Sequence, residues 1–88
     1  METKEYARIA EEIFGRQPAV QTEEFNAEME AQLETLTPAE KEAVLAACLE
    51  GKTKDEEQRK DYAKGMRKLR HPSRSKKLLP FMSPREGN

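Results

Sequence analysis

The chain has 88 residues and a net charge of −1, with 38% charged residues, 35% hydrophobic residues and no tryptophan. At this length folding hides only roughly 60% of the surface that the unfolded chain exposes, so one small domain with a thin core is expected. The single cysteine, Cys48, excludes an internal disulfide, and the chain lacks both a zinc-type Cys/His cluster and an apolar run of the roughly 20 residues that a membrane span needs. We therefore expect a cytoplasmic protein that holds no metal and no cofactor.

Apolar residues at helical spacing predict a first helix over about residues 3–14. They fall at i, i+3, i+4, i+7 and i+8, which places them on one face of the helix: Tyr6, Ile9, Ala10, Ile13 and Phe14. Gly15 offers a left-handed stop and Pro18 prevents continuation, so a loop is expected over residues 15–21.

Two further helices are predicted over residues 22–36 and 37–50. Thr22 is suited to cap the first of them, and its apolar positions repeat at spacings of four, four and three: Phe25, Met29, Leu33 and Leu36. The next helix begins with a capping box formed by Thr37 and Glu40, with a proline in its first position. It carries Val44, Leu45, Cys48 and Leu49 and ends at a glycine, residue 51.

A fourth helix is predicted over residues 53–70, from a second capping-box pattern at Thr53 and Glu56. Its apolar stripe is sparse and comprises Tyr62, Met66 and Leu69. A proline after His71 ends it, and no segment alternates with the period of two that a strand requires. The predicted fold is all-α: a small bundle of about four short helices over residues 1–70, followed by a basic, partly flexible tail over residues 71–88.

The small net charge conceals two oppositely charged parts. Residues 1–57 carry six Lys/Arg against fifteen Asp/Glu, whereas residues 58–88 carry ten against two. This asymmetry favours a basic segment that seeks a polyanion and is joined to an acidic body. The alternative is internal neutralisation, in which the acidic part screens the basic part.

One segment carries specific information, the stretch from Ala63 to Leu78, which reads A-K-G-M-R-K-L-R-H-P-S-R-S-K-K-L. It resembles the end of the C-terminal promoter-recognition region (region 4) of primary bacterial sigma factors, where R-K-L-R-H-P-S-R-S follows the recognition helix. The twelve residues 67–78 match the family pattern. Residues 36–45, L-T-P-A-E-K-E-A-V-L, are similar to the helix that opens the region, which reads L-x-x-R-E-x-x-V-L. The resemblance implies a transcription protein of the bacterial cytoplasm.

The resemblance is incomplete between these two segments. The family has a full helix-turn-helix there, but only fifteen residues separate Gly51 from Arg67, about half the family's number, so one helix is missing or merged. Glu56, Arg59 and Lys60 fall where the family contacts bases or phosphates. Gln58 and Asp61 fall at positions that are apolar in the family, so this helix is not expected to pack in the usual way. Residues 1–30 lie outside the resemblance.

The basic segment supplies the candidate DNA-binding residues. They lie on or after the fourth predicted helix and form a strip able to contact several phosphates of a duplex: Arg59, Lys60, Lys64, Arg67, Lys68, Arg70, Arg74, Lys76 and Lys77. The alternative is that these residues form a charged helix face that contacts only solvent. Aromatic residues are scarce in this strip, which favours duplex backbone over single strands as the ligand.

The resemblance also implies a second, apolar contact. In the family this region presents an apolar surface to the flap of the RNA polymerase beta subunit. The corresponding candidates for partner binding are Leu36, Val44, Leu45 and Leu49. Their alternative role is plain core.

Catalytic chemistry is not expected. His71 marks a helix end in the family motif, Cys48 has no neighbouring cation to activate it, and no phosphate-binding glycine loop occurs. The leading hypothesis is a sigma-related protein that binds RNA polymerase, promoter DNA or both. The alternatives are an interaction regulator that mimics part of a sigma factor without contacting DNA, and a degenerate sigma remnant.

Overall fold

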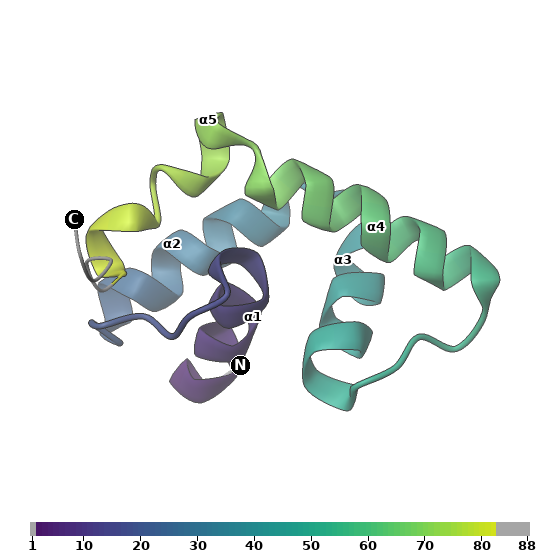
Figure 1. Cartoon of the computed structure of the whole chain (residues 1–88), viewed down its shortest axis with the longest axis horizontal. Helices are drawn as coiled ribbons and strands as arrows, with labels where there is room; N and C mark the ends of the chain where they lie inside the picture. The colour runs from purple at the N-terminus through teal and green to yellow at the C-terminus, as the bar shows by residue number, and fades with distance from the viewer. Residues whose placement is uncertain (1, 83–88) are drawn as a thin grey trace.

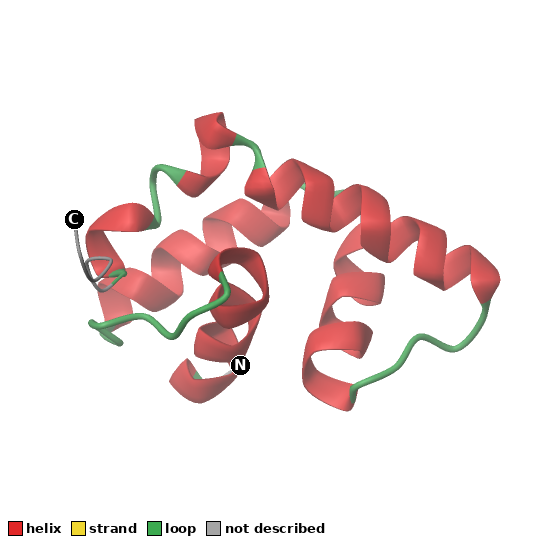
Figure 2. Cartoon of the chain, viewed as in Figure 1, coloured by secondary structure: helices red, strands yellow, loops and turns green. Residues whose placement is uncertain are grey.

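Helices account for most of the chain, as the sequence predicts. The computed structural model describes residues 2–82, and 73% of it is helical, with no strand in that range (Figure 2). The elements in chain order are α1 (Thr3–Phe14), α2 (Glu23–Glu34), α3 (Pro38–Leu45), the π-helical segment η1 (Ala46–Glu50), α4 (Glu56–Arg70), α5 (Pro72–Ser75) and the 3₁₀ turn η2 (Leu79–Phe81) (Figure 1). The all-α prediction is confirmed. Within the described range no helix combines the length and the apolar character that crossing a bilayer requires.

Caps set the ends of the first three helices close to their predicted positions. Thr22 accepts a hydrogen bond from the Phe25 amide at the start of α2. Thr37 and Glu40 form the predicted capping box of α3, with distances of 3.2 and 3.0 Å. Gly15, with a φ of 75°, ends α1 in the left-handed conformation that a glycine adopts without strain.

The predicted start of the fourth helix at residue 53 is wrong by three residues, because α4 begins at Glu56. Asp55 is its N-cap and accepts the Gln58 amide at 2.8 Å, while the Gln58 side chain accepts the Lys54 amide at 2.8 Å. These two bonds satisfy the Gln58 amide in the first turn and the Lys54 amide just before the helix, and Thr53, the predicted cap, lies in the preceding loop.

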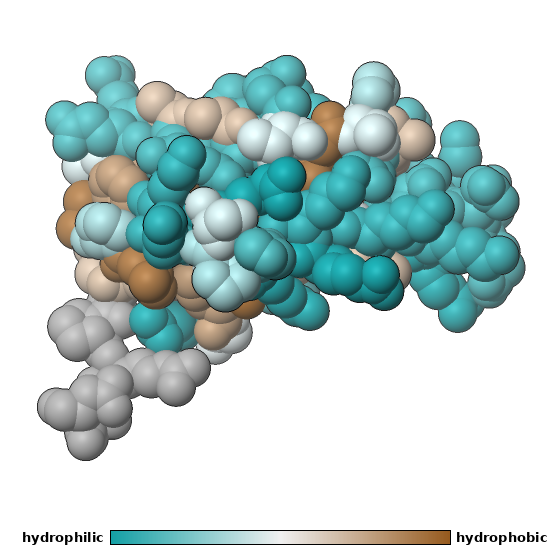
Figure 3. Space-filling model, turned by 90° about the horizontal axis from the view of Figure 1, so that it is seen from above, coloured by the Kyte–Doolittle hydropathy of each residue, from teal (hydrophilic) through white to brown (hydrophobic). Residues whose placement is uncertain are grey.

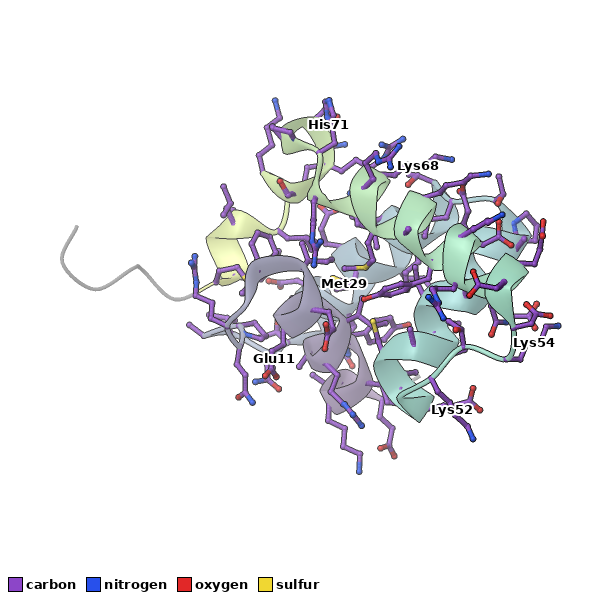
Figure 4. The ribbon with its side chains drawn as sticks, turned by 45° about the vertical axis from the view of Figure 1, so that its right-hand side comes forward. Glu11, Met29, Lys52, Lys54, Lys68 and His71 are labelled. Atoms are coloured by element: carbon purple, nitrogen blue, oxygen red, sulfur yellow. The ribbon has the colours of Figure 1, made fainter. Side chains whose placement is uncertain are left out.

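One hydrophobic core joins all the longer helices. α1 packs against α2, and α4 crosses the upper side of α3 (Figure 1). α3 and α4 approach closely at Gly65, where an added Cβ would lie 2.9 Å from the Val44 side chain. Phe25, Met29 and Leu33 of α2 are fully buried, and Figure 4 shows Met29 in the interior between the helices.

The segment after α4 is also part of this core. Leu78 is fully buried and Met82 is 7% exposed. The Phe81 ring meets the Phe25 ring edge to face at 5.7 Å, and the Phe81 carbonyl accepts the Ala19 amide at 2.8 Å. Residues 78–82 therefore pack on the bundle, so the core extends beyond the predicted division at residue 70, whereas α5 contributes no buried residue. The rest of the predicted tail, residues 83–88, lies outside the described part of the chain.

Candidate nucleic-acid interface

α4 separates its buried and charged residues by helical periodicity. Gln58, Gly65, Met66 and Leu69 face the bundle and are buried. Lys60, Lys64 and Arg67 lie at i, i+4 and i+7 on the opposite face and are exposed. With a rise of about 1.5 Å per residue, these three cations form a row about 10 Å long, the outer row. Figure 3, which views the molecule from above, shows a largely hydrophilic surface over this side.

Two of the nine predicted DNA-binding residues are paired with acids. Arg59 contacts Glu56 at 3.0 Å, one turn away in the same helix, and both side chains are 70% exposed. Lys68 contacts Glu40 of α3 at 2.7 Å, and the Glu40 side chain is 7% exposed. Hydrogen bonds from Lys68 and from the Thr37 amide hold the pKa of Glu40 below its ordinary value. Lys68 therefore fastens α4 to α3.

Two further predicted residues donate to backbone carbonyls. Arg70 donates to the Glu12 carbonyl at the end of α1 at 2.9 Å, and Arg74 donates to the Lys68 carbonyl at 3.4 Å. Both bonds satisfy carbonyls in the last turn of a helix. Because a carbonyl is neutral, neither contact neutralises its arginine.

The other five predicted residues are exposed: the outer row together with Lys76 and Lys77. Within residues 2–82, no carboxylate lies in ion-pair distance of any of them. In the same range, Glu40–Lys68 is the one ion pair that links the acidic and basic parts between separate helices. Most of the predicted cations therefore have no ion-pair partner among residues 2–82.

The four candidates for partner binding fall into two groups. Leu36 and Val44 are core residues, 7% and 0% exposed. Leu45 and Leu49 are partly buried and line a groove of about 780 Å³ between the start of α1, α3 with η1, and the loop before α4. Figure 4 labels two lysines, Lys52 and Lys54, on that loop at the rim of the groove.

The structure also shows a feature that the sequence did not single out, a groove of about 470 Å³ along the second half of α4. Its lining residues are Tyr62, Ala63, Met66, Arg67, Arg70 and His71. We refer to it as the Tyr62 groove. The sequence assigns Tyr62 to a core stripe, but its side chain is only partly buried. The spacing of Tyr62, Met66 and Arg70 at i, i+4 and i+8 is a signal that could have revealed it.

Cys48 lies in the core and His71 lies at a helix cap. Cys48 is 4% exposed, and burial raises the pKa of its thiol to about 11, which opposes formation of the reactive thiolate. His71 caps α5, because its Nδ1 accepts the Ser73 amide at 3.2 Å. In the described part of the chain, no group of three or more His, Cys, Asp or Glu residues is placed to hold a metal ion.

Comparison of the chain with protein-family models, with curated proteins and with solved structures finds no match.

Proposed function

We propose that this chain is a sigma-factor-related transcription protein that binds duplex DNA through the outer row of α4 and the lysines after α5. The observation that carries the proposal is the exposure of Lys60, Lys64 and Arg67 on one helix face, with no carboxylate of residues 2–82 within ion-pair distance of them. A basic face of this kind attracts the phosphate backbone. The resemblance of residues 67–78 to the sigma pattern supports the same reading.

The first turn of α4 is acidic and its second half is basic, so the helix is better suited to contact phosphates with its second half than to insert its first turn into a groove and read bases. Its first turn carries Glu56 and Glu57, with Asp55 as the cap, and Arg59 is engaged by Glu56. Carboxylates in this position repel the phosphates that flank a groove. The second half of the helix is cationic instead, so binding should depend little on DNA sequence.

Salt dependence measures this contact. Each phosphate that is neutralised contributes a slope of about −0.9 in log affinity against log salt, so three to five contacts predict a slope of about −3 to −4.5. Lys60, Lys64 and Arg67 can be replaced together by Gln without loss of any hydrogen bond or ion pair recorded among residues 2–82. Lys68 and Arg70 are poorer targets, because they fasten α4 to α3 and α1.

The test is a fluorescence-anisotropy titration of a labelled DNA duplex at several salt concentrations. K60Q/K64Q/R67Q should flatten the slope by up to about three units. The control variant K4Q/K52Q/K54Q removes the same charge from exposed lysines away from the outer row and should retain most of the slope. Binding that is insensitive to salt, or equal losses in the two variants, would contradict the proposal.

A second function, binding of RNA polymerase without DNA, is favoured by the apolar groove at Leu45 and Leu49. In this second function, the groove is the contact for the flap of the beta subunit. L49S, which changes a partly buried side chain, should then weaken capture of purified polymerase, whereas K60Q/K64Q/R67Q should affect it less. Polymerase capture combined with no measurable affinity for DNA would establish this function in place of the first.

A further inference from the structure

The Tyr62 groove combines an apolar floor with a cationic rim. Tyr62 and Met66 lie one turn apart on α4, while Arg67, Arg70 and His71 occupy the adjoining positions. A volume of about 470 Å³ falls within the range of small-ligand sites, roughly 300–1,000 Å³, and exceeds the volume of one nucleic-acid base. The Tyr62 groove shares Arg67 with the outer row. A nucleic-acid strand bound along the outer row therefore passes the rim of the groove.

The arginines at the rim of the Tyr62 groove retain positive charge and hydrogen-bond donors that can bind an anion. The bond from Arg70 to the Glu12 carbonyl uses one guanidinium donor and orients the side chain, leaving the remaining donors and the full positive charge. No carboxylate among residues 2–82 pairs with Arg67 or Arg70. Arginine suits a phosphate because its planar fork can donate two parallel hydrogen bonds.

The acid that opposes an anion here is Glu12. Its carboxylate lies near enough to Tyr62 to help raise the pKa of the phenol, as a smaller cause than burial and Cys48. The Glu12 side chain is exposed and is separate from the carbonyl that holds Arg70. Its charge can therefore be removed without disturbing the rim.

We infer that the Tyr62 groove receives one unstacked base of a single-stranded nucleic acid, with the adjoining phosphate on Arg67 and Arg70. This inference rests on the proposed function and adds to it a preference for strands that are locally open. A base inside a duplex is already stacked and paired, and extracting it breaks both interactions. A base in a single strand avoids that cost and gains a stacking contact with the aromatic ring.

The test compares an oligothymidine with a DNA duplex of equal length, under the same salt conditions. Base stacking on an aromatic side chain contributes roughly 1–3 kcal/mol, so Tyr62→Leu should weaken single-strand binding by about 5- to 150-fold. Tyr62→Phe should retain it, and neither change should alter duplex binding. Glu12→Gln should strengthen single-strand binding, because it removes the opposing charge.

A second measurement covers the case in which Tyr62→Leu fails to fold. The chain has no tryptophan and two tyrosines, so Tyr6→Phe leaves Tyr62 as the source of the fluorescence. Addition of oligothymidine to this variant should quench the tyrosine emission. Bound oligothymidine without quenching, or equal single-strand binding by folded Tyr62→Leu, overturns the inference and leaves salt-dependent duplex binding standing. Absence of binding to both forms of DNA would remove the DNA-binding proposal as well.

Discussion

The contact between Gly65 and Val44 predicts whether a side chain added at residue 65 raises or lowers the stability of the protein. A Cβ added at Gly65 would lie 2.9 Å from Cγ2 of Val44, and 3.5 and 3.6 Å from the carbonyl oxygen and Cβ of Glu40. The last two are ordinary contacts, so the overlap is with Val44 alone. Val44 is fully buried and β-branched, which leaves its methyl group little freedom to move.

Two opposing effects set the size of the change. Alanine is preferred to glycine inside a helix by about 0.5–1 kcal/mol, whereas overpacking a well-filled core costs about 1–3 kcal/mol. Gly65→Ala should therefore lower the free energy of unfolding by about 1 kcal/mol, which for a chain of this size lowers Tm by about 4–8 °C. The steric effect wins because the neighbour is a stiff, buried side chain.

A double-mutant cycle isolates the overlap. Val44→Ala costs about 2 kcal/mol by itself, but it removes the methyl group that the new Cβ meets. In that background Gly65→Ala should stabilise the protein by about 0.5–1 kcal/mol, so the substitution changes sign. Urea unfolding followed by circular dichroism measures all four proteins. Stabilisation by Gly65→Ala in the wild-type background, or an equal cost in both backgrounds, would show that the new Cβ does not overlap with Val44.

Three other substitutions or reactions test the packing. Glu40→Gln keeps the capping geometry of α3 but loses the ion pair with Lys68, at a cost of about 1 kcal/mol near neutral pH. Because the folded-state pKa of Glu40 is lowered, the stabilisation is complete above the unfolded-state value of about 4.3 and is lost as the pH falls through the folded-state value, so acid titration of Tm should show a smaller decrease for the variant. Leu78→Ala should cost about 2–5 kcal/mol in urea unfolding, whereas Leu79→Ala, at a side chain that is 48% exposed, should cost less than about 1 kcal/mol; similar costs would mean that residues after α4 do not belong to the core. Cys48 should react slowly with a thiol reagent at pH 8 and rapidly in urea, since burial raises its pKa to about 11, and rapid native labelling would contradict its placement.

Local signals accounted for most of the secondary structure. The apolar spacing of α1, the Thr37–Glu40 capping box and the stop at Gly15 each depend on residues within one or two turns, so the chain alone predicts them. The start of α4 was predicted incorrectly because Thr53 and Asp55 both offer a capping oxygen. The choice between them depends on Gln58, whose side chain bonds back to the Lys54 amide.

The candidate interface was predictable only as a list of charges. Periodicity places Lys60, Lys64 and Arg67 on one face, and the sequence supplies that much. It does not separate them from Lys68 and Arg70, because the partners of these two are Glu40, 28 residues away, and the Glu12 carbonyl, 58 residues away. Contacts over such separations depend on how the helices pack.

Short-range periodicity, capping and composition were enough to predict the helical class, most helix ends, the acidic and basic parts and the burial of Cys48. Helix packing sets which cations are paired within residues 2–82, that Leu45 and Leu49 border a groove while Val44 fills the core, and that Leu78 is buried after a basic segment. It also opened the groove beside Tyr62. The physical reason is the same in each case: a side chain becomes paired, buried or accessible according to the neighbours that another helix brings to it, and no local pattern encodes those neighbours.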